Sequence, residues 1–192
     1  MPVIVLVRHG ATLWSESGRH TGRTDLPLSE LGAAQARSLS PILAGLSPGT
    51  ILSSPLIRAR TTAELAGFGQ RILLEPDLLE WDYGDYEGLT TLEIRKTNPG
   101  WDLFTDGAPR GESPPQAFER ARRVADRLRK APSDTLIFAH GHILRLLIAA
   151  WLELPPDRAR HFVLKTAAPT LLGTEHEWPA LLAMNALSTL TH

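Results

Sequence analysis

The stretch Val3-Ile4-Val5-Leu6-Val7, followed at once by Arg8-His9-Gly10, decides the fold. All five residues of the run are aliphatic, without the polar alternation of a strand that has one wet face, so the run predicts a strand buried on both faces of a parallel sheet. A second apolar run, Thr135-Leu136-Ile137-Phe138-Ala139, ends in the same way at His140-Gly141-His142. Both predicted strands therefore end in a histidine next to a glycine.

Strand and helix signals alternate along the rest of the chain. We expect further strands at Thr50–Leu52 and Arg71–Leu74, with weaker ones at Phe162–Leu164, Thr170–Thr174 and Ala180–Met184. Helices are expected from the N-cap Ser29 to about Leu46, over Leu56–Ala66, after Ser113 with Gln116 as its capping-box partner, and over Ile143–Leu154. The polar stretch Leu13–Leu28 is interpreted as a long loop. This order predicts one domain over residues 1–192, a three-layer α/β/α sandwich with a mainly parallel central sheet.

The composition excludes several classes of protein. The chain has 192 residues, of which 43% are apolar and 21% charged, as expected for a globular domain with its own core. Its net charge of -1 favours neither nucleic acid nor a membrane as a partner, and the arginines between Arg120 and Arg129 are interpreted as a helix face turned mostly to water. The absence of cysteine excludes disulfides and thiolate chemistry. The N-terminal run reads as a strand rather than a signal peptide, so we expect a soluble, cytoplasmic protein.

Polar residues follow three of the predicted strands at the point where each ends. These residues are Arg8 and His9, then Ser53-Ser54-Pro55 with Arg58 close behind, and His140. Because ligands of open α/β sheets bind beyond the carboxyl ends of the strands, we expect these side chains to meet at one edge. Guanidinium groups bind phosphate through a planar fork, so a dianionic phosphate fits this set. With no cysteine available, His9 can act as the nucleophile and form a phosphohistidine.

A carboxyl group is also needed, because the leaving alcohol must receive a proton. The segment Leu78–Gly88 offers Glu80 between aromatic residues, a setting that can keep a carboxyl protonated near neutral pH. After the alcohol departs, the same carboxylate can activate water. Asp82, Asp85 and Glu87 are competing candidates for this role.

Taken together, these segments resemble the histidine phosphatase superfamily, the phosphoglycerate mutase-like proteins of branch 1. The resemblance is carried, in order, by Leu6–Thr12 with its Arg-His-Gly motif, Thr21–Gly32, Ser53–Ala63, Glu80–Gly88, Gly111–Ser113 and His140–Gly141. Within the family, Trp14–Asp25 and Glu80–Gly88 look closest to mycobacterial acid phosphatases and yeast-type sedoheptulose bisphosphatases. The resemblance therefore implies a phosphoglycerate mutase-like fold and favours hydrolysis of a small phosphomonoester, such as a sugar phosphate, over a mutase reaction.

The resemblance also implies a role for each site residue. His9 is the phosphorylated nucleophile, Glu80 is the proton donor and later the base, and Arg8, Arg58 and His140 form a phosphate clamp. Further contacts to substrate or phosphate are expected from Ser15, Thr21, Gly22, Tyr83, Gly141 and His142. No metal and no organic cofactor is implied.

Three other functions are weighed against this one. A mutase would keep the phosphoryl group for a second hydroxyl, and a catalytically idle phosphate-binding module would lack the nucleophile or the acid. A metal site would use His9, His140 and His142, but the two adjacent arginines would repel a cation.

Several finer points stay open at the level of sequence. A homodimer through the C-terminal strands is an alternative to a monomer. The carboxylates of Glu80–Glu87 would repel a highly anionic substrate unless Arg19, Arg23 or Arg110 offset them. His20 is placed near the mouth of the site, whereas His161, His176 and His192 are interpreted as structural or surface residues.

Overall fold

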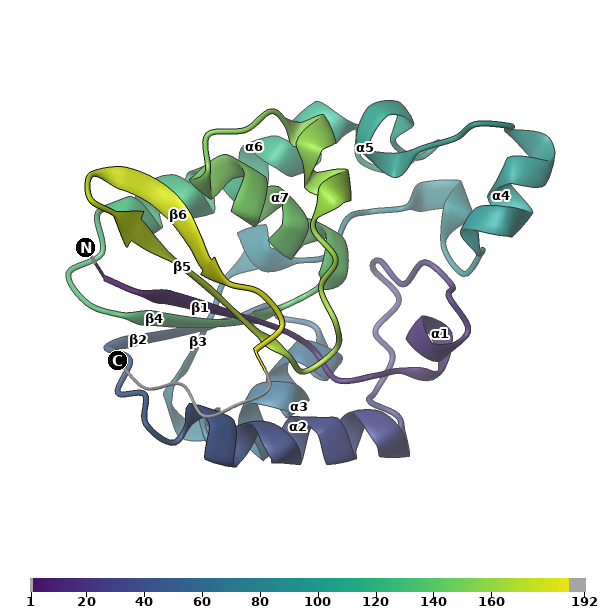
Figure 1. Cartoon of the computed structure of the whole chain (residues 1–192). Helices are drawn as coiled ribbons and strands as arrows, with labels where there is room; N and C mark the ends of the chain where they lie inside the picture. Colours follow the sequence, from purple (N-terminus) through teal and green to yellow (C-terminus); the bar gives the residue numbers. More distant parts are fainter. Residues whose placement is uncertain (1, 187–192) are drawn as a thin grey trace.

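A six-stranded sheet in the order β3-β2-β4-β1-β5-β6 forms the centre of the computed structural model, which describes residues 2–186 (Figure 1). The strands are β1 (Ile4–Arg8), β2 (Thr50–Ser53), β3 (Ile72–Leu74), β4 (Thr135–Ala139), β5 (Pro169–Glu175) and β6 (Trp178–Ala183). The four strands from β3 to β1 run parallel, while β5 is antiparallel to β1 and β6 to β5. The predicted mainly parallel sheet is confirmed.

Helices cover both faces of this sheet. They are α1 (Leu13–Glu16), α2 (Glu30–Leu43), α3 (Ile57–Leu65), α4 (Thr91–Thr97), α5 (Leu103–Asp106), α6 (Pro114–Arg129) and α7 (Gly141–Trp151), with short 3-10 turns between them. Figure 1 shows α2 and α3 on one face and α6 and α7 on the other. Alternate residues of β1 pack on opposite faces of the sheet. Val5 and Val7 pack with α2 and α3, whereas Leu6 packs with α6 and α7. The three-layer sandwich is therefore confirmed.

Two helix starts follow the capping signals of the sequence. The Ser29 hydroxyl accepts a hydrogen bond from the Gly32 N–H at 3.1 Å, and the Ser113 N–H donates to Oε1 of Gln116 at 2.9 Å. α7 begins directly after β4, with His140 as its N-cap residue. The end of β4 and the positive end of the α7 dipole are thus at the same place.

Glycines allow α2 to lie against the segment that follows β1. A Cβ atom on Gly32 would overlap the carbonyl of Ala11, and one on Gly10 would overlap the carbonyl of Gly32. Only glycine at both positions permits this close backbone approach. The approach fixes the direction in which the chain leaves β1, immediately after His9.

Two predicted elements differ from the structure. The segment Phe162–Leu164 forms no strand, and the Leu164 carbonyl instead accepts a hydrogen bond from Nη1 of Arg8 at 2.8 Å. The long loop Leu13–Leu28 contains the short helix α1, because the Thr12 side chain caps its first turn through the Ser15 N–H. His192 lies outside the described residues.

The arginines of α6 also depart from the prediction that they mostly face water. Arg122 and Arg123 are half exposed, as expected, but the Arg120 side chain is only 12% exposed. Nη1 of Arg120 donates to the carbonyls of Asp77 at 2.7 Å and Leu79 at 3.0 Å. A charge pattern could not reveal this, because the carbonyls come from a distant segment of the chain.

None of the helices within residues 2–186 is long and apolar enough to cross a membrane.

Candidate active site

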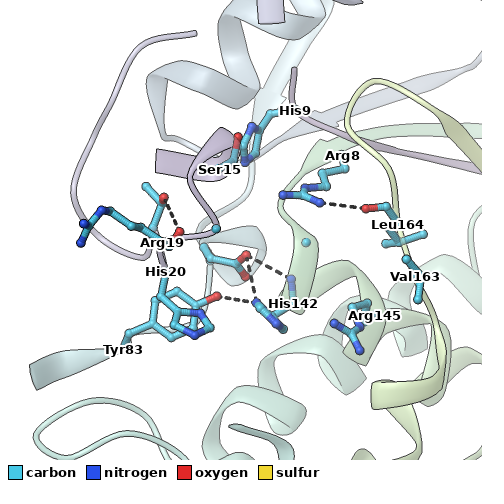
Figure 2. A pocket seen from close by; sticks show the side chains of 14 residues that line it. Arg8, His9, Ser15, Arg19, His20, Tyr83, His142, Arg145, Val163 and Leu164 are labelled. Carbon is cyan, nitrogen blue, oxygen red and sulfur yellow. Dashed lines mark hydrogen bonds and ion pairs between the residues drawn. The ribbon is translucent and has the colours of Figure 1, made fainter. Parts of the chain in front are cut away.

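A cavity of about 210 Å³ opens beyond the carboxyl ends of β1 and β4 (Figure 2). Most of the residues predicted for the site line it, namely Arg8, His9, Ser15, Thr21, Glu80, Tyr83, Gly141 and His142. Arg58 and His140 are fully buried and are not part of the lining. The topology therefore brings the predicted residues together, but in two layers.

His9 is held by main-chain carbonyls through its own main-chain N–H and through its ring. Its main-chain N–H donates to the carbonyl of Ala139 at the end of β4, 2.9 Å away. Its Nδ1 lies 2.7 Å from the Gly10 carbonyl, and because a carbonyl can only accept, the proton belongs on Nδ1 and the lone pair on Nε2. Burial, followed by the charges of Arg8 and Arg58, lowers the pKa of His9 well below its usual value. The ring is therefore neutral, with a free nucleophilic nitrogen.

Arg8 lines the cavity and carries a buried N–H without a partner in the part of the chain that the structure describes. Its Nη1 is bonded to Leu164, but its Nε is buried and has no hydrogen-bond partner among residues 2–186. A Cβ atom on Gly141 would lie 3.5 Å from this Nε, an ordinary van der Waals contact, so Gly141 and the Arg8 guanidinium are direct neighbours. Leaving a buried donor unpaired is costly, and the Arg8 site is suited to an incoming oxyanion that accepts from it.

Arg58 and His140 form the layer behind His9. Nε of Arg58 donates to Nδ1 of His140 at 3.1 Å, so the His140 proton is on Nε2, which lies 2.7 Å from the Ser54 hydroxyl. The ring centroids of His9 and His140 are 5.1 Å apart. Burial and the Arg58 charge lower the pKa of His140 well below its usual value. Both nitrogens of His140 are thus engaged with protein groups.

The remaining donors of Arg58 bind the loop before α2. Nη1 donates to the Thr24 carbonyl at 2.9 Å, and Nη2 donates to the carbonyls of Thr21 at 3.1 Å and Gly22 at 2.9 Å. Arg58 therefore orients both the His140 ring and the loop that forms a wall of the cavity. It also places a positive charge behind His9.

Glu80 is held at the start of α7. Its Oε1 accepts from the N–H groups of Trp81 and Ile143, both at 2.9 Å, and its Oε2 accepts from the His142 N–H at 3.0 Å. Three main-chain donors thus hold the carboxyl group, and Nδ1 of His142 lies 3.9 Å from Oε2. Oε2 makes a single hydrogen bond with the main chain and so has room for a transferable proton.

Aromatic and imidazole groups form the outer end of the cavity. The Tyr83 hydroxyl lies 2.5 Å from Nδ1 of His142, and the rings of Tyr83 and His20 are 4.8 Å apart. Burial raises the pKa of Tyr83 well above its usual value and lowers that of His142 well below it. Burial also lowers the pKa of His20 to about 4. All three groups are therefore neutral near pH 7.

Comparison with known proteins identifies the family. The model of the histidine phosphatase superfamily (branch 1) matches residues 4–187. This chain belongs to that superfamily. A solved structure of an open reading frame product from Mycobacterium tuberculosis superposes with a TM-score of 0.91 at 38% identity, covering 96% of this chain and 97% of that one.

Curated relatives of this branch 1 histidine phosphatase include the two groups that the sequence resembles. An acid phosphatase of Mycobacterium tuberculosis is 41% identical over 90% of this chain and 87% of its own length. A sedoheptulose 1,7-bisphosphatase of Saccharomyces cerevisiae is 36% identical over 80% of this chain and 68% of its own length. A probable phosphoglycerate mutase of Erwinia tasmaniensis is 30% identical over 86% of this chain and 81% of its length.

Gly22 corrects one expectation for this histidine phosphatase. Its N–H, expected to donate to phosphate, instead donates to Oε1 of Glu87 at 2.8 Å, and Gly22 does not line the cavity. A Cβ atom there would lie 2.6 Å from the Trp81 carbonyl, so glycine is needed for packing. Glu87 also accepts from the N–H of Thr24 at 2.9 Å, which gives it a structural task in the same loop.

Ser15 and Thr21 reach the cavity with hydroxyls that already have main-chain partners. The Ser15 hydroxyl donates to the Thr12 carbonyl at 3.0 Å, and the Thr21 hydroxyl donates to the Arg19 carbonyl at 3.3 Å. Either hydroxyl can still accept a hydrogen bond from a protonated ligand oxygen.

Within residues 2–186, no group of three or more histidine, aspartate or glutamate side chains is arranged to hold a metal ion.

Sequence reasoning missed several contributors to the cavity, among them Arg145 and Leu164. Both line it, and Leu164 also fixes Arg8. A signal for Arg145 was available, because it lies four residues after Gly141 on α7 and so shares the helix face of that glycine. Leu164 carried no such signal, since its contribution is a main-chain carbonyl brought in by a loop.

Proposed function

We propose that this chain is a metal-independent phosphatase that hydrolyses small phosphomonoesters, such as sugar phosphates, through a covalent phosphohistidine at His9. The observation that carries the proposal is the neutral His9 ring, whose Nδ1 is tied to the Gly10 carbonyl and whose Nε2 is free in a cavity shared with Arg8 and Glu80. The names of the mycobacterial acid phosphatase and the yeast bisphosphatase support hydrolysis as the reaction.

In the first half-reaction, Nε2 of His9 attacks the phosphorus atom in line with the leaving alcohol. The N–P bond forms as the bond from phosphorus to the ester oxygen breaks, and the proton on Oε2 of Glu80 passes to that oxygen. Arg8 stabilises the charge on the equatorial oxygens through its unpartnered Nε–H. The products of this step are the free alcohol, the phosphohistidine and the Glu80 carboxylate.

In the second half-reaction, water attacks the phosphohistidine from the side that the alcohol has left. The Glu80 carboxylate takes a proton from this water, the N–P bond breaks, and the electron pair returns to Nε2 of His9. Inorganic phosphate leaves, and both residues are restored. The three main-chain N–H groups around Glu80 keep it in place through both steps.

We assign Arg58 and His140 to the clamp as groups that act from behind His9. Arg58 supplies positive charge, and the His140 ring packs edge-on against the His9 ring, with 5.1 Å between their centroids. Ser15, Thr21, Tyr83, Gly141 and His142 shape the space in front of His9. The partner in this scheme is a small molecule, and we place the protein in the cytoplasm as a single domain over residues 1–192.

A direct assay separates hydrolysis from the rival mutase reaction. The purified chain is incubated with 3-phosphoglycerate, and released phosphate is measured against the 2-phospho isomer. We expect phosphate to be the main product. Formation of mainly the isomer would reject hydrolysis as the principal reaction.

Metal independence is tested with a chelator. We expect the turnover of p-nitrophenyl phosphate to be unchanged by EDTA, because Arg8 and Arg58 supply the positive charge that a metal would otherwise provide. Loss of turnover in EDTA that added zinc restores would replace the phosphohistidine scheme with a metal-based one.

A homodimer through the C-terminal strands, the alternative to a monomer, would use the exposed side chains of Trp178 and Leu182 on β6. Light scattering on the purified chain would give the mass of two chains if this surface is an interface, and the mass of one chain if it is not.

A further inference from the structure

We propose that the outer end of the cavity carries a second phosphate-binding subsite, formed by Arg145 with Arg95 and Arg160, which selects substrates bearing a phosphate besides the one that is cleaved. The proposal rests on the phosphatase function proposed above. It assigns the side chains that would recognise the part of the substrate remote from His9.

A second cavity of about 220 Å³ adjoins the one that contains His9. The two share His20, His142 and Arg145 in their walls, and the second is also lined by Arg95 and Arg160. Figure 2 shows Arg145 together with His142 among the side chains around the first cavity. The second space thus lies directly beyond His142 as seen from Arg8, and the proposal places the remote phosphate of the substrate there.

Arg145 carries a positive charge that no carboxylate neutralises at close range. Its Nε donates to the Ala159 carbonyl at 3.0 Å and its Nη2 to the Arg160 carbonyl at 2.7 Å, while the guanidinium lies 4.7 Å from the centre of the Phe104 ring. Within residues 2–186, no carboxylate oxygen lies within 4.0 Å of it, and its Nη1 takes part in no hydrogen bond. Partial burial makes an unpaired charge of this kind unfavourable unless a ligand compensates it.

The neighbouring charges favour a dianion. Nη1 of Arg160 pairs with Asp102 at 3.1 Å, whereas Nε of Arg95 donates to the Trp101 carbonyl at 2.9 Å. Three guanidinium groups thus face one carboxylate, an excess of positive charge that a phosphate dianion balances better than a carboxylate does. His20 and His142 are neutral and add hydrogen-bonding nitrogens at the boundary between the two cavities.

The arginines that the sequence suggested for this task are already paired. Arg19 lies 3.5 Å from Glu93, Arg23 lies 3.7 Å from Glu112, and Arg110 pairs with Asp85. Glu80 and Glu87, two of the carboxylates expected to repel an anion, each accept hydrogen bonds from main-chain N–H groups. Arg145 is therefore the group left to receive the second phosphate.

The test measures binding in the His9→Ala background, where no turnover consumes the ligand. Calorimetry compares fructose 1,6-bisphosphate with fructose 6-phosphate, which lacks the second phosphate, and with 3-phosphoglycerate, which carries a carboxylate. We expect the bisphosphate to bind about 10- to 100-fold more tightly than the monophosphate, as a charge-assisted pair predicts. Adding Arg145→Met should reduce this preference to about twofold or less on the same scale.

The matched control is Arg158→Met, which removes the same charge from an exposed arginine that lines neither cavity and should leave the preference unchanged. Arg145→Lys should keep part of the preference. If Arg145→Met fails to fold, Arg160→Met is the second variant and should weaken the preference in the same direction.

A preference that is absent, or that survives both Arg145→Met and Arg160→Met, would overturn the subsite. Equally strong dependence on Arg145 for 3-phosphoglycerate would overturn phosphate as its ligand. Failure of the wild-type chain to hydrolyse any phosphomonoester would instead overturn the proposed function, because the binding ratio does not depend on turnover.

Discussion

The two ends of the cavity are built from different kinds of contact. At the inner end, His9 is oriented by the Gly10 carbonyl and Glu80 by three main-chain N–H groups. At the outer end, side chains also contact side chains: Tyr83 meets His142, and Arg145 combines two main-chain carbonyls with the face of the Phe104 ring. Main-chain contacts do not depend on neighbouring side chains, so the inner end suits a fixed reaction, whereas the outer end can change its specificity by single substitutions.

The largest expected effect lies at the inner end. His9→Ala removes the nucleophile, and we expect kcat for p-nitrophenyl phosphate to fall by at least about 1000-fold. His161→Ala, at an exposed position outside both cavities, is the control and should keep its rate. Residual activity near that of the wild type in His9→Ala would show that another group attacks phosphorus.

Glu80→Gln should have the next largest effect. It keeps the shape of the side chain but cannot transfer a proton, so we expect kcat for an alkyl phosphate to fall about 100- to 10,000-fold. The loss should be smaller for p-nitrophenyl phosphate, whose leaving group needs no proton. Asp85→Asn tests a competing acid, and a larger loss there than in Glu80→Gln would reassign the role.

Arg120 links the inner end to α6 and gives a test of stability. Arg120→Met breaks the ion pair with Glu112 at 2.7 Å and the bonds to the carbonyls before Glu80, and should lower the free energy of unfolding by about 3 kcal/mol. Arg122→Met, on the same helix but half exposed, should change it by less than about 1 kcal/mol. Urea denaturation measures both, and equal losses would contradict the contrast.

The smallest effect concerns pH at the outer end. Unfolded His20 binds a proton near pH 6.5, whereas its folded pKa is about 4 because of burial, so between these values the unfolded state holds more protons. The free energy of unfolding therefore falls as the pH drops from 6.5 to 4. In His20→Gln this fall should be smaller, by about 2 kcal/mol at pH 5. Parallel stability curves for the variant and the wild type would show that His20 titrates normally.

Residues placed by a local motif could be predicted from the sequence, whereas residues placed by long-range contacts could not. That Arg8, His9 and Glu80 line one cavity could be predicted, because a strand end or a short motif places each of them. Gly22 was misassigned because its N–H is taken by Glu87, a contact 65 residues away along the chain. Arg120 was predicted to face water for a similar reason, because its carbonyl partner lies far away along the chain. Phe162–Leu164 was predicted as a strand, but the Leu164 carbonyl accepts a hydrogen bond from Arg8. Long-range contacts between main chain and side chain leave no local pattern.

The central claim is that His9 carries the phosphoryl group during turnover. Rapid quenching of the chain with a labelled phosphomonoester, followed by peptide mass spectrometry under conditions that preserve phosphohistidine, tests it most directly. We predict one added HPO3 group, acid-labile, on the peptide that contains His9, and none in His9→Ala. Label on His140 or His142, or full turnover with no labelled histidine at any quench time, would contradict the claim.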